Sequence, residues 1–246
     1  MKLDIVFSPL GLSQNETGGR TVLVVDVLRA TTTMCAALTN GAKAVIPVAS
    51  TEEALKLAQT LGDDVVLAGE QNCVRIPGFA LGNSPREMTA EAVKGKQVVL
   101  RTTNGTPAML AIAGAAAIYP AAAANLSLVG AKAREVFLRD RDLLIVCCGR
   151  ENAFSLDDAY CAGRLAVAAM GGRRSAKGLN DAAIACLDLV RRYGTNWERP
   201  FRFSRAGREL TKLGFAEDVA DAARPDAYPV LAHFHERRVT VVATTP

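Results

Sequence analysis

The sequence predicts an α/β fold in which helices cover both faces of a largely parallel or mixed sheet, a layered α/β/α arrangement. Short apolar runs such as Thr21–Val25 and Leu143–Cys147 lack polar alternation, which is typical of strands buried on both faces. Helical patterns separate these runs, and strands that alternate with helices favour a parallel sheet. Half of the 246 residues are hydrophobic and few are aromatic, so the chain can form a substantial core.

The individual elements follow from these patterns and from the residues that start or stop them. Thr51 and the acidic residues after it open one helix, and Asn40–Gly41 closes another. Strands are expected at Leu3–Phe7, Thr21–Val25, Ala44–Val48, Asp64–Ala68, Gln97–Leu100, Ala117–Tyr119 and Leu143–Cys147, with strand-like runs at Pro229–Leu231 and Arg238–Ala243. Helices are expected at Met34–Leu38, Ser50–Leu61, Pro85–Val93, Pro107–Ala113, Leu126–Leu138, Ser155–Gly171, Lys177–Tyr193, Ser204–Gly214 and Ala216–Ala223.

We expect residues 1–246 to form one unit. A soft boundary near residues 95–125 is the alternative, and it gives two α/β subdomains with the site between them. No clear linker marks such a boundary.

Composition and charge argue against several classes of protein. The net charge of +4 is mild, and no basic stripe with interleaved aromatic residues indicates a nucleic-acid surface. The N-terminal apolar run is too short for a signal peptide, and no stretch is long enough to span a membrane. The six cysteines form no Cys-x-x-Cys pair, which indicates small buried hydrophobes in a reducing compartment. We therefore expect a cytoplasmic protein without nucleic-acid or membrane partners, whose alanine- and valine-rich helices allow a homodimer.

The most informative stretch runs from Thr21 to Thr33. A buried strand ends at Asp26, and Arg29 and three consecutive threonines follow before the next helix. Ligands of open α/β sheets bind outside the carboxyl ends of the strands. A carboxylate suits Mg²⁺, and a guanidinium with hydroxyls and a helix N-terminus suits an oxyanion. The alternative is that Asp26 and the threonines only cap the helix.

Other predicted strand ends carry polar residues of the same kinds. Glu70 follows Gly69, Arg101–Pro107 follows the strand at Gln97, and Gly149–Asn152 follows the strand at Leu143. The strand ends before Asp26, Arg101 and Gly149 each lead into an arginine. These three ends can converge on one anion, although turn residues recur widely and the likeness can arise by chance. Asn83–Ser84 and Asn104–Gly105 have an alternative role as turns, and Asp157–Asp158 as partners of a helix dipole.

Familiar catalytic motifs do not account for these residues. Cys186 and Arg192 form a literal Cys-x5-Arg motif, but the intervening residues continue a helix and offer no phosphate-binding loop. His233 and His235 share one face of a strand and are better explained as a solvated pair than as metal ligands. Neither GxxxxGK[ST] nor a GxGxxG after a strand occurs, so no standard nucleotide loop is expected.

The motifs taken together resemble one known family. In chain order they are Asp26–Thr33, Gly69–Glu70, Gly82–Pro85, Thr102–Thr106, Gly149–Glu151, Ser155–Asp158, Cys161–Gly163 and Gly214–Asp218. Over nearly the whole chain this order and spacing resemble the 2-phosphosulfolactate phosphatase (ComB) family. The resemblance implies a Mg²⁺-dependent phosphomonoesterase that converts 2-phosphosulfolactate to 3-sulfolactate and phosphate. In methanogens this step belongs to coenzyme M synthesis, and the implied fold is an α/β fold distinct from the common phosphatase folds.

The resemblance also implies roles for individual residues. The catalytic candidates are Asp26, Arg29, Glu70 and Asp158, and Mg²⁺ is assigned to the carboxylates of Asp26, Glu70 and Asp158. Candidates for binding the anionic substrate are Thr31, Thr32, Asn83, Ser84, Arg101, Thr103, Asn104, Gly105, Thr106 and Arg150. Whether Asp26 attacks phosphorus directly or a carboxylate activates water stays open at this stage.

Three alternatives accompany this interpretation. A phosphatase of the same fold can act on another small anionic phosphate ester, and a non-catalytic module can bind anions without turnover. A haloacid-dehalogenase-type phosphatase requires Asp-x-Asp, but Leu28 occupies the second acidic position. One departure from the resemblance is the segment Gln71–Arg75, which is often glycine-rich in relatives.

Overall fold

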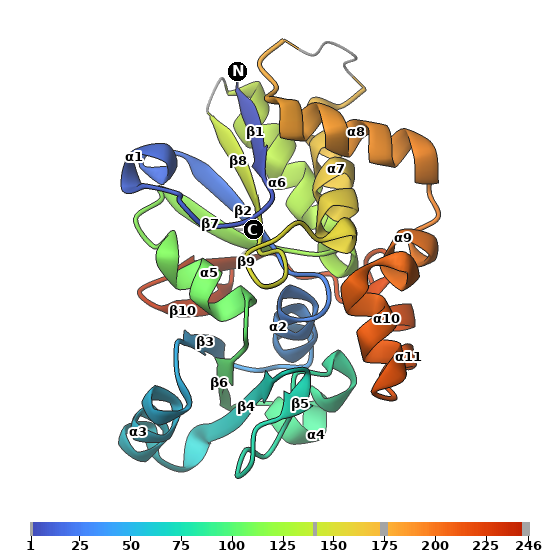
Figure 1. The fold of residues 1–246 in the computed structure, drawn as a ribbon. Helices are drawn as coiled ribbons and strands as arrows, with labels where there is room; N and C mark the ends of the chain where they lie inside the picture. The colour runs from blue at the N-terminus through green and yellow to red at the C-terminus, as the bar shows by residue number, and fades with distance from the viewer. Residues whose placement is uncertain (1, 140–141, 173–176, 243–246) are drawn as a thin grey trace.

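The computed structural model describes residues 2–139, 142–172 and 177–242. Its strands form two sheets, and the chain passes between them more than once (Figure 1). The four-stranded sheet is entirely parallel and consists, in spatial order, of β1 (Leu3–Val6), β8 (Leu143–Cys147), β2 (Thr21–Val25) and β7 (Ala117–Ala121). The six-stranded sheet has the order β5 (Val74–Arg75), β4 (Val65–Gln71), β6 (Gln97–Arg101), β3 (Ala44–Val48), β10 (Arg238–Val241) and β9 (Ala232–His235).

The six-stranded sheet is mixed. Strands β4, β6 and β3 are parallel, whereas β5, β10 and β9 are antiparallel to their neighbours. The helices of four residues or more are α1 (Gln14–Thr17), α2 (Ala30–Thr39), α3 (Thr51–Leu61), α4 (Ala90–Val93), α5 (Gly105–Ala111), α6 (Leu126–Leu138), α7 (Leu156–Met170), α8 (Asp181–Tyr193), α9 (Glu198–Phe203), α10 (Arg205–Lys212) and α11 (Ala216–Ala222). The expected α/β fold with a largely parallel or mixed sheet is confirmed.

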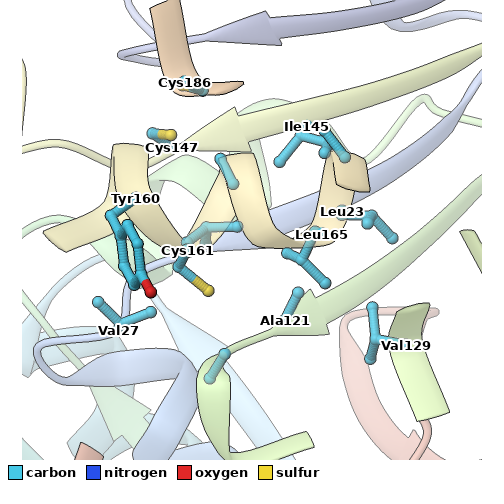
Figure 2. Packing of buried hydrophobic residues seen from close by; sticks show 14 of the residues in the cluster. Leu23, Val27, Ala121, Val129, Ile145, Cys147, Tyr160, Cys161, Leu165 and Cys186 are labelled. Carbon is cyan, nitrogen blue, oxygen red and sulfur yellow. The ribbon is translucent and has the colours of Figure 1, made fainter. Parts of the chain in front are cut away.

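Alternation along the strands divides the core into layers. Leu23 and Val25 of β2 face a cluster that contains residues of α6, α7 and α8, whereas Val22 and Val24 face α2 and α5. Figure 2 shows Leu23, Val27, Tyr160 and Cys161 within the first of these clusters. The second cluster also contains residues of β3, β4 and β6, so α2 and α5 pack between the two sheets. Because both faces of β2 are covered, its apolar run needs no polar alternation.

Most expected elements are present, and β2, β3, β8 and α6 have the expected bounds. The strand expected at Pro229–Leu231 is wrong, since the strand there is β9 at Ala232–His235. The hairpin turn explains the shift: Glu236 and Arg237 both have positive φ, and His235 pairs with Arg238. A two-residue turn of this kind fixes the register of the strand before it.

Five helix or strand assignments differ from those expected. Helix α2 begins at Ala30 rather than Met34, so the three threonines lie inside it. Helix α8 begins at Asp181 rather than Lys177, because the Asn180 side chain accepts a hydrogen bond from the amide of Ala183 and caps the helix there. Strand β5 and helices α1 and α9 were not expected.

The soft boundary near residues 95–125 stays a prediction. Within that interval the chain leaves β6 in the six-stranded sheet and enters β7 in the four-stranded sheet. No helix in the described part of the chain is long and apolar enough to cross a membrane.

Candidate functional site

A polar cavity lies where strands of both sheets end. Its volume is about 80 Å³, several times the roughly 10–15 Å³ that one water requires, so it has room for a small ligand. Strands β2 and β8 of one sheet and β4 and β6 of the other lead into its lining. The lining residues are Asp26, Leu28, Arg29, Glu70, Asn72, Cys73, Asn83, Thr102, Thr103, Asn104, Arg150 and Glu151.

Asp26 is held in place by the turn that joins β2 to α2. Its Oδ1 accepts a hydrogen bond from the amide of Ala30 at 3.2 Å. Thr31 Oγ1 donates to the carbonyl of Asp26 at 2.7 Å and accepts from its amide at 3.1 Å. Burial raises the pKa of Asp26 to about 7, and the charges of Asp157 and Glu70 add to this, against the opposing effects of Ala30 and Arg29. The carboxylate is therefore fixed in position, and its burial favours the protonated form.

Glu70 connects two loops of the cavity wall. Its Oε1 accepts from the amide of Thr103 and its Oε2 from the amide of Cys73, each at 2.7 Å. The preceding residue is Gly69, whose φ is 153° and where a side chain would collide with the carbonyl oxygen of Arg101. This close approach of β4 to β6 brings Glu70 to the cavity.

Two arginines supply the positive charge of the cavity. Arg29 is 3% exposed and donates to Asp218 at 2.7 Å and to the carbonyl of Cys73 at 2.9 Å. Arg150 forms an ion pair with Glu209 at 2.6 Å, and its terminal nitrogens lie 3.8 and 3.9 Å from Cys73 Sγ. Arg150 lines the cavity, and its Nε is buried without a hydrogen-bond partner among the described residues. This donor is therefore a candidate contact for an anionic ligand.

Asn83 provides a further unused group. The residue lines the cavity and is 4% exposed, and its side-chain oxygen Oδ1 is buried without a hydrogen-bond partner. A buried amide oxygen without a partner is costly. Because oxygen is the ligand atom that Mg²⁺ prefers, the amide oxygen of Asn83 is a candidate cation ligand beside the two carboxylates that line the cavity. Among the described residues, no group of three or more His, Cys, Asp or Glu side chains can hold a metal ion by itself.

Asp158 was expected to bind metal but does not line the cavity. Its Oδ1 and Oδ2 each accept a backbone hydrogen bond at 3.0 Å, from Val27 and Gly149 respectively. Burial raises its pKa well above the usual range, and the charges of Asp157 and Asp26 act in the same direction. In this arrangement Asp158 joins the ends of β2 and β8, and its role as a metal ligand stays a prediction.

Several expected substrate-binding residues support the cavity from outside its lining. Thr31 and Thr32 donate their hydroxyls to the carbonyls of Asp26 and Val27. Ser84 donates to Asp218, and Arg101 donates to the carbonyl of Glu70. Thr106 exchanges hydrogen bonds with Thr102, and Gly105 packs against Asp26. The expected residues that line the cavity are Asp26, Arg29, Glu70, Asn83, Thr103, Asn104 and Arg150. Roles in catalysis and binding stay predictions for both groups.

Sequence reasoning assigned no role to Asp218 or Cys73. Asp218 was noted only within a late segment of the family pattern, and nothing in its neighbourhood along the chain points to Arg29. Cys73 lies in the segment that departs from the glycine-rich pattern, and its φ is +66°. This departure from the family pattern was the signal in the sequence that could have pointed to Cys73.

Comparisons with known proteins agree with the architecture of the site. The family model for 2-phosphosulpholactate phosphatase matches residues 6–237. A protein of Symbiobacterium thermophilum named probable 2-phosphosulfolactate phosphatase is 39% identical over 228 residues, covering 92% of this chain and 96% of that protein. A protein of Clostridium novyi with the same name is 32% identical over 242 residues, covering 98% of this chain and 100% of that protein. The chain belongs to the 2-phosphosulfolactate phosphatase family.

Proposed function

We propose that this protein hydrolyses 2-phosphosulfolactate to 3-sulfolactate and inorganic phosphate, with Mg²⁺ as cofactor. Overall, one water is consumed, the ester P–O bond breaks, the phosphorus gains the oxygen of that water, and the released alkoxide of sulfolactate takes up a proton from it. The same reaction is the phosphatase step of coenzyme M synthesis. The family membership supports the reaction class, and the relatives' names support the substrate.

The observation that carries the proposal is the arrangement of charge in the cavity. Asp26 and Glu70 face the same cavity as Arg29 and Arg150. Phosphoryl transfer depends mainly on positioning and on stabilising charge around phosphorus. A cavity with both carboxylates and guanidinium groups can hold a cation and an anionic ester together.

The residues present fit a Mg²⁺ ion. Asp26 and Glu70 supply carboxylate oxygens, and the unpartnered Oδ1 of Asn83 supplies an amide oxygen. Both carboxylates are largely buried, and a cation offsets the cost of burying such charges together. When bound there, Mg²⁺ neutralises charge on the phosphoryl oxygens and orients water.

The two arginines of the cavity are each assigned a different anionic group of the substrate. Arg29 is next to Asp26 in the turn after β2, so we assign the phosphoryl group to it. Arg150 contacts the sulfur of Cys73, whereas Arg29 contacts the carbonyl of the same residue, and the Nε of Arg150 has no partner among the described residues. We assign the carboxylate or sulfonate of the substrate to Arg150. Asp26 is required either as the attacking group or as the base for water.

The test is phosphate release from 2-phosphosulfolactate, with phospholactate and p-nitrophenyl phosphate in parallel, for wild type and Asp26→Asn. We expect turnover that EDTA abolishes and added Mg²⁺ restores, with preference for 2-phosphosulfolactate and loss in the variant. Equal turnover in EDTA would contradict the metal assignment. Release from all three esters at one rate would contradict the substrate, and release from none would contradict the activity.

A cytoplasmic location, a homodimer and the absence of nucleic-acid partners stay predictions from the sequence. Equilibrium sedimentation tests the homodimer directly, and a single species of 26 kDa would contradict it.

A further inference from the structure

We propose that Asp218 is a positioning residue that holds Arg29 in the orientation required to bind the phosphoryl group. This inference rests on the proposed function, because it assumes that Arg29 contacts substrate. Asp218 belongs to α11 and is 189 residues from Arg29 along the chain.

Several contacts hold the side chains of Asp218 and Arg29 in place. Oδ2 of Asp218 accepts from Arg29 at 2.7 Å, and Oδ1 accepts from Ser84 Oγ at 2.7 Å. The guanidinium lies over the Phe215 ring, 4.5 Å from its centroid, and donates to the carbonyl of Cys73. Since the guanidinium is planar, these contacts set its orientation as well as its position. Each terminal nitrogen of Arg29 carries a second N–H, so donors remain for a ligand.

Without Asp218, Arg29 is expected to pair with another carboxylate of the cavity. Arg29 and Asp26 both lie in the turn between β2 and α2, and both line the cavity. A guanidinium without Asp218 is expected to pair with Asp26 or Glu70, which face the same cavity. Such a pair would occupy both the anion-binding group and a carboxylate assigned to the metal. Asp218 therefore keeps the opposite charges of the cavity apart.

Helix α11 offers a matched control one turn away. Asp221 also accepts from an arginine, Arg86, at 2.7 Å. The Arg86 side chain is 48% exposed and does not line the cavity. Asp221→Asn thus removes an aspartate–arginine pair from the same helix without affecting an arginine of the site. A purely structural role of α11 predicts comparable effects of both substitutions.

The experiment compares Asp218→Asn, Asp221→Asn, Arg29→Gln and the double variant Arg29→Gln/Asp218→Asn. We measure kcat and KM for 2-phosphosulfolactate and the affinity for inorganic phosphate by calorimetry. Asp218→Asn is expected to lower kcat about 100-fold, the effect of a misplaced binding group, and to weaken phosphate binding. Asp221→Asn is expected to change either value by no more than about twofold, as for an exposed ion pair. The double variant is expected to match Arg29→Gln alone, because Asp218 acts through Arg29.

Several results would overturn the inference. These are full activity in Asp218→Asn, equal losses in Asp218→Asn and Asp221→Asn, or a double variant whose loss is the product of the two single losses. If Asp218→Asn does not fold because Arg29 is buried without a partner, the double variant lacks both charges and its comparison with Arg29→Gln decides. If wild type releases phosphate from no ester, the proposed function fails, and phosphate affinity alone then tests Asp218. If wild type in addition binds no inorganic phosphate, both proposals are overturned.

Discussion

Gly105, at the start of α5, lies directly against the carboxylate of Asp26. A Cβ atom at residue 105 would be 2.6 Å from Oδ2 of Asp26 and 2.5 Å from the Cβ of Ala30. Such contacts are too short for any real Cβ, so either α5 or the turn after β2 must move if this glycine is replaced. Packing at the site therefore requires glycine at residue 105, in addition to any role of Asn104–Gly105 as a turn.

Gly105→Ala is expected to lower kcat about 100-fold, because the added methyl group displaces the carboxylate of Asp26 from its position in the site. Phosphate release measures this effect. Gly114→Ala is the control, because a Cβ at residue 114 meets nothing within 4 Å and φ there is not positive. Wild-type activity in Gly105→Ala would show that Asp26 does not depend on this close approach.

Glu70→Gln is expected to destabilise the protein by about 1–3 kcal/mol, because the amide presents an NH₂ group where the carboxylate accepted a backbone N–H. Both oxygens of Glu70 are used in this way, by Thr103 and Cys73. Urea unfolding at equilibrium measures the loss. Glu52→Gln, at an exposed residue paired with Lys56, should change the free energy of unfolding little. Equal stability of the two variants would refute the assigned role of Glu70.

Arg150→Gln is expected to reduce activity on 2-phosphosulfolactate about 10- to 100-fold, as for loss of a hydrogen bond to a charged group. Activity on p-nitrophenyl phosphate should fall much less, because that ester has neither carboxylate nor sulfonate. Arg205→Gln is the control: Arg205 pairs with Glu151 near the same strand end but is 63% exposed. If Arg150→Gln lowered the activity on both esters equally, Arg150 would instead bind the phosphoryl group or support the structure of the site.

Cys73 is expected to be the thiol that alkylating reagents modify in the native protein. It is partly exposed and lines the cavity, whereas the other five cysteines are buried. Burial raises the pKa of its thiol, against the lowering effect of Arg150. Because the thiolate is the reactive form, the rate of modification by iodoacetamide should keep rising as the pH increases above the usual pKa of a cysteine thiol, about 8.5. Mass spectrometry identifies the modified residue.

Modification of Cys73 is expected to inhibit the enzyme, and inorganic phosphate should slow the inhibition. Cys73→Ser is the matched control and should retain activity after the same treatment. Inhibition of this variant at the wild-type rate would show that another residue is responsible, and labelling of a buried cysteine would contradict the packing around it.

The sequence by itself determined the class of fold and the strand ends at which chemistry is placed. The run Thr21–Val25 has no polar residue after Thr21 because helices cover both faces of β2, and that local pattern suffices to predict a buried strand followed by Asp26. The same reasoning placed Glu70, Thr103 and Arg150 at the ends of other strands, and these residues line the cavity; their roles came from the family resemblance. These predictions needed only the alternation of elements and the rule that sites form at carboxyl ends of strands.

Only the tertiary structure decided how those ends meet and which polar groups are already occupied. The strands divide between two sheets whose ends face one cavity, an arrangement that no local pattern encodes. The hydroxyls of Thr31 and Thr32 bind backbone carbonyls because α2 begins at Ala30, and Asp158 is engaged by two amides. Arg29 donates a hydrogen bond to Asp218, which is 189 residues away along the chain. Pairing of buried charges is set by packing between distant segments, and periodicity along the chain carries no information about it.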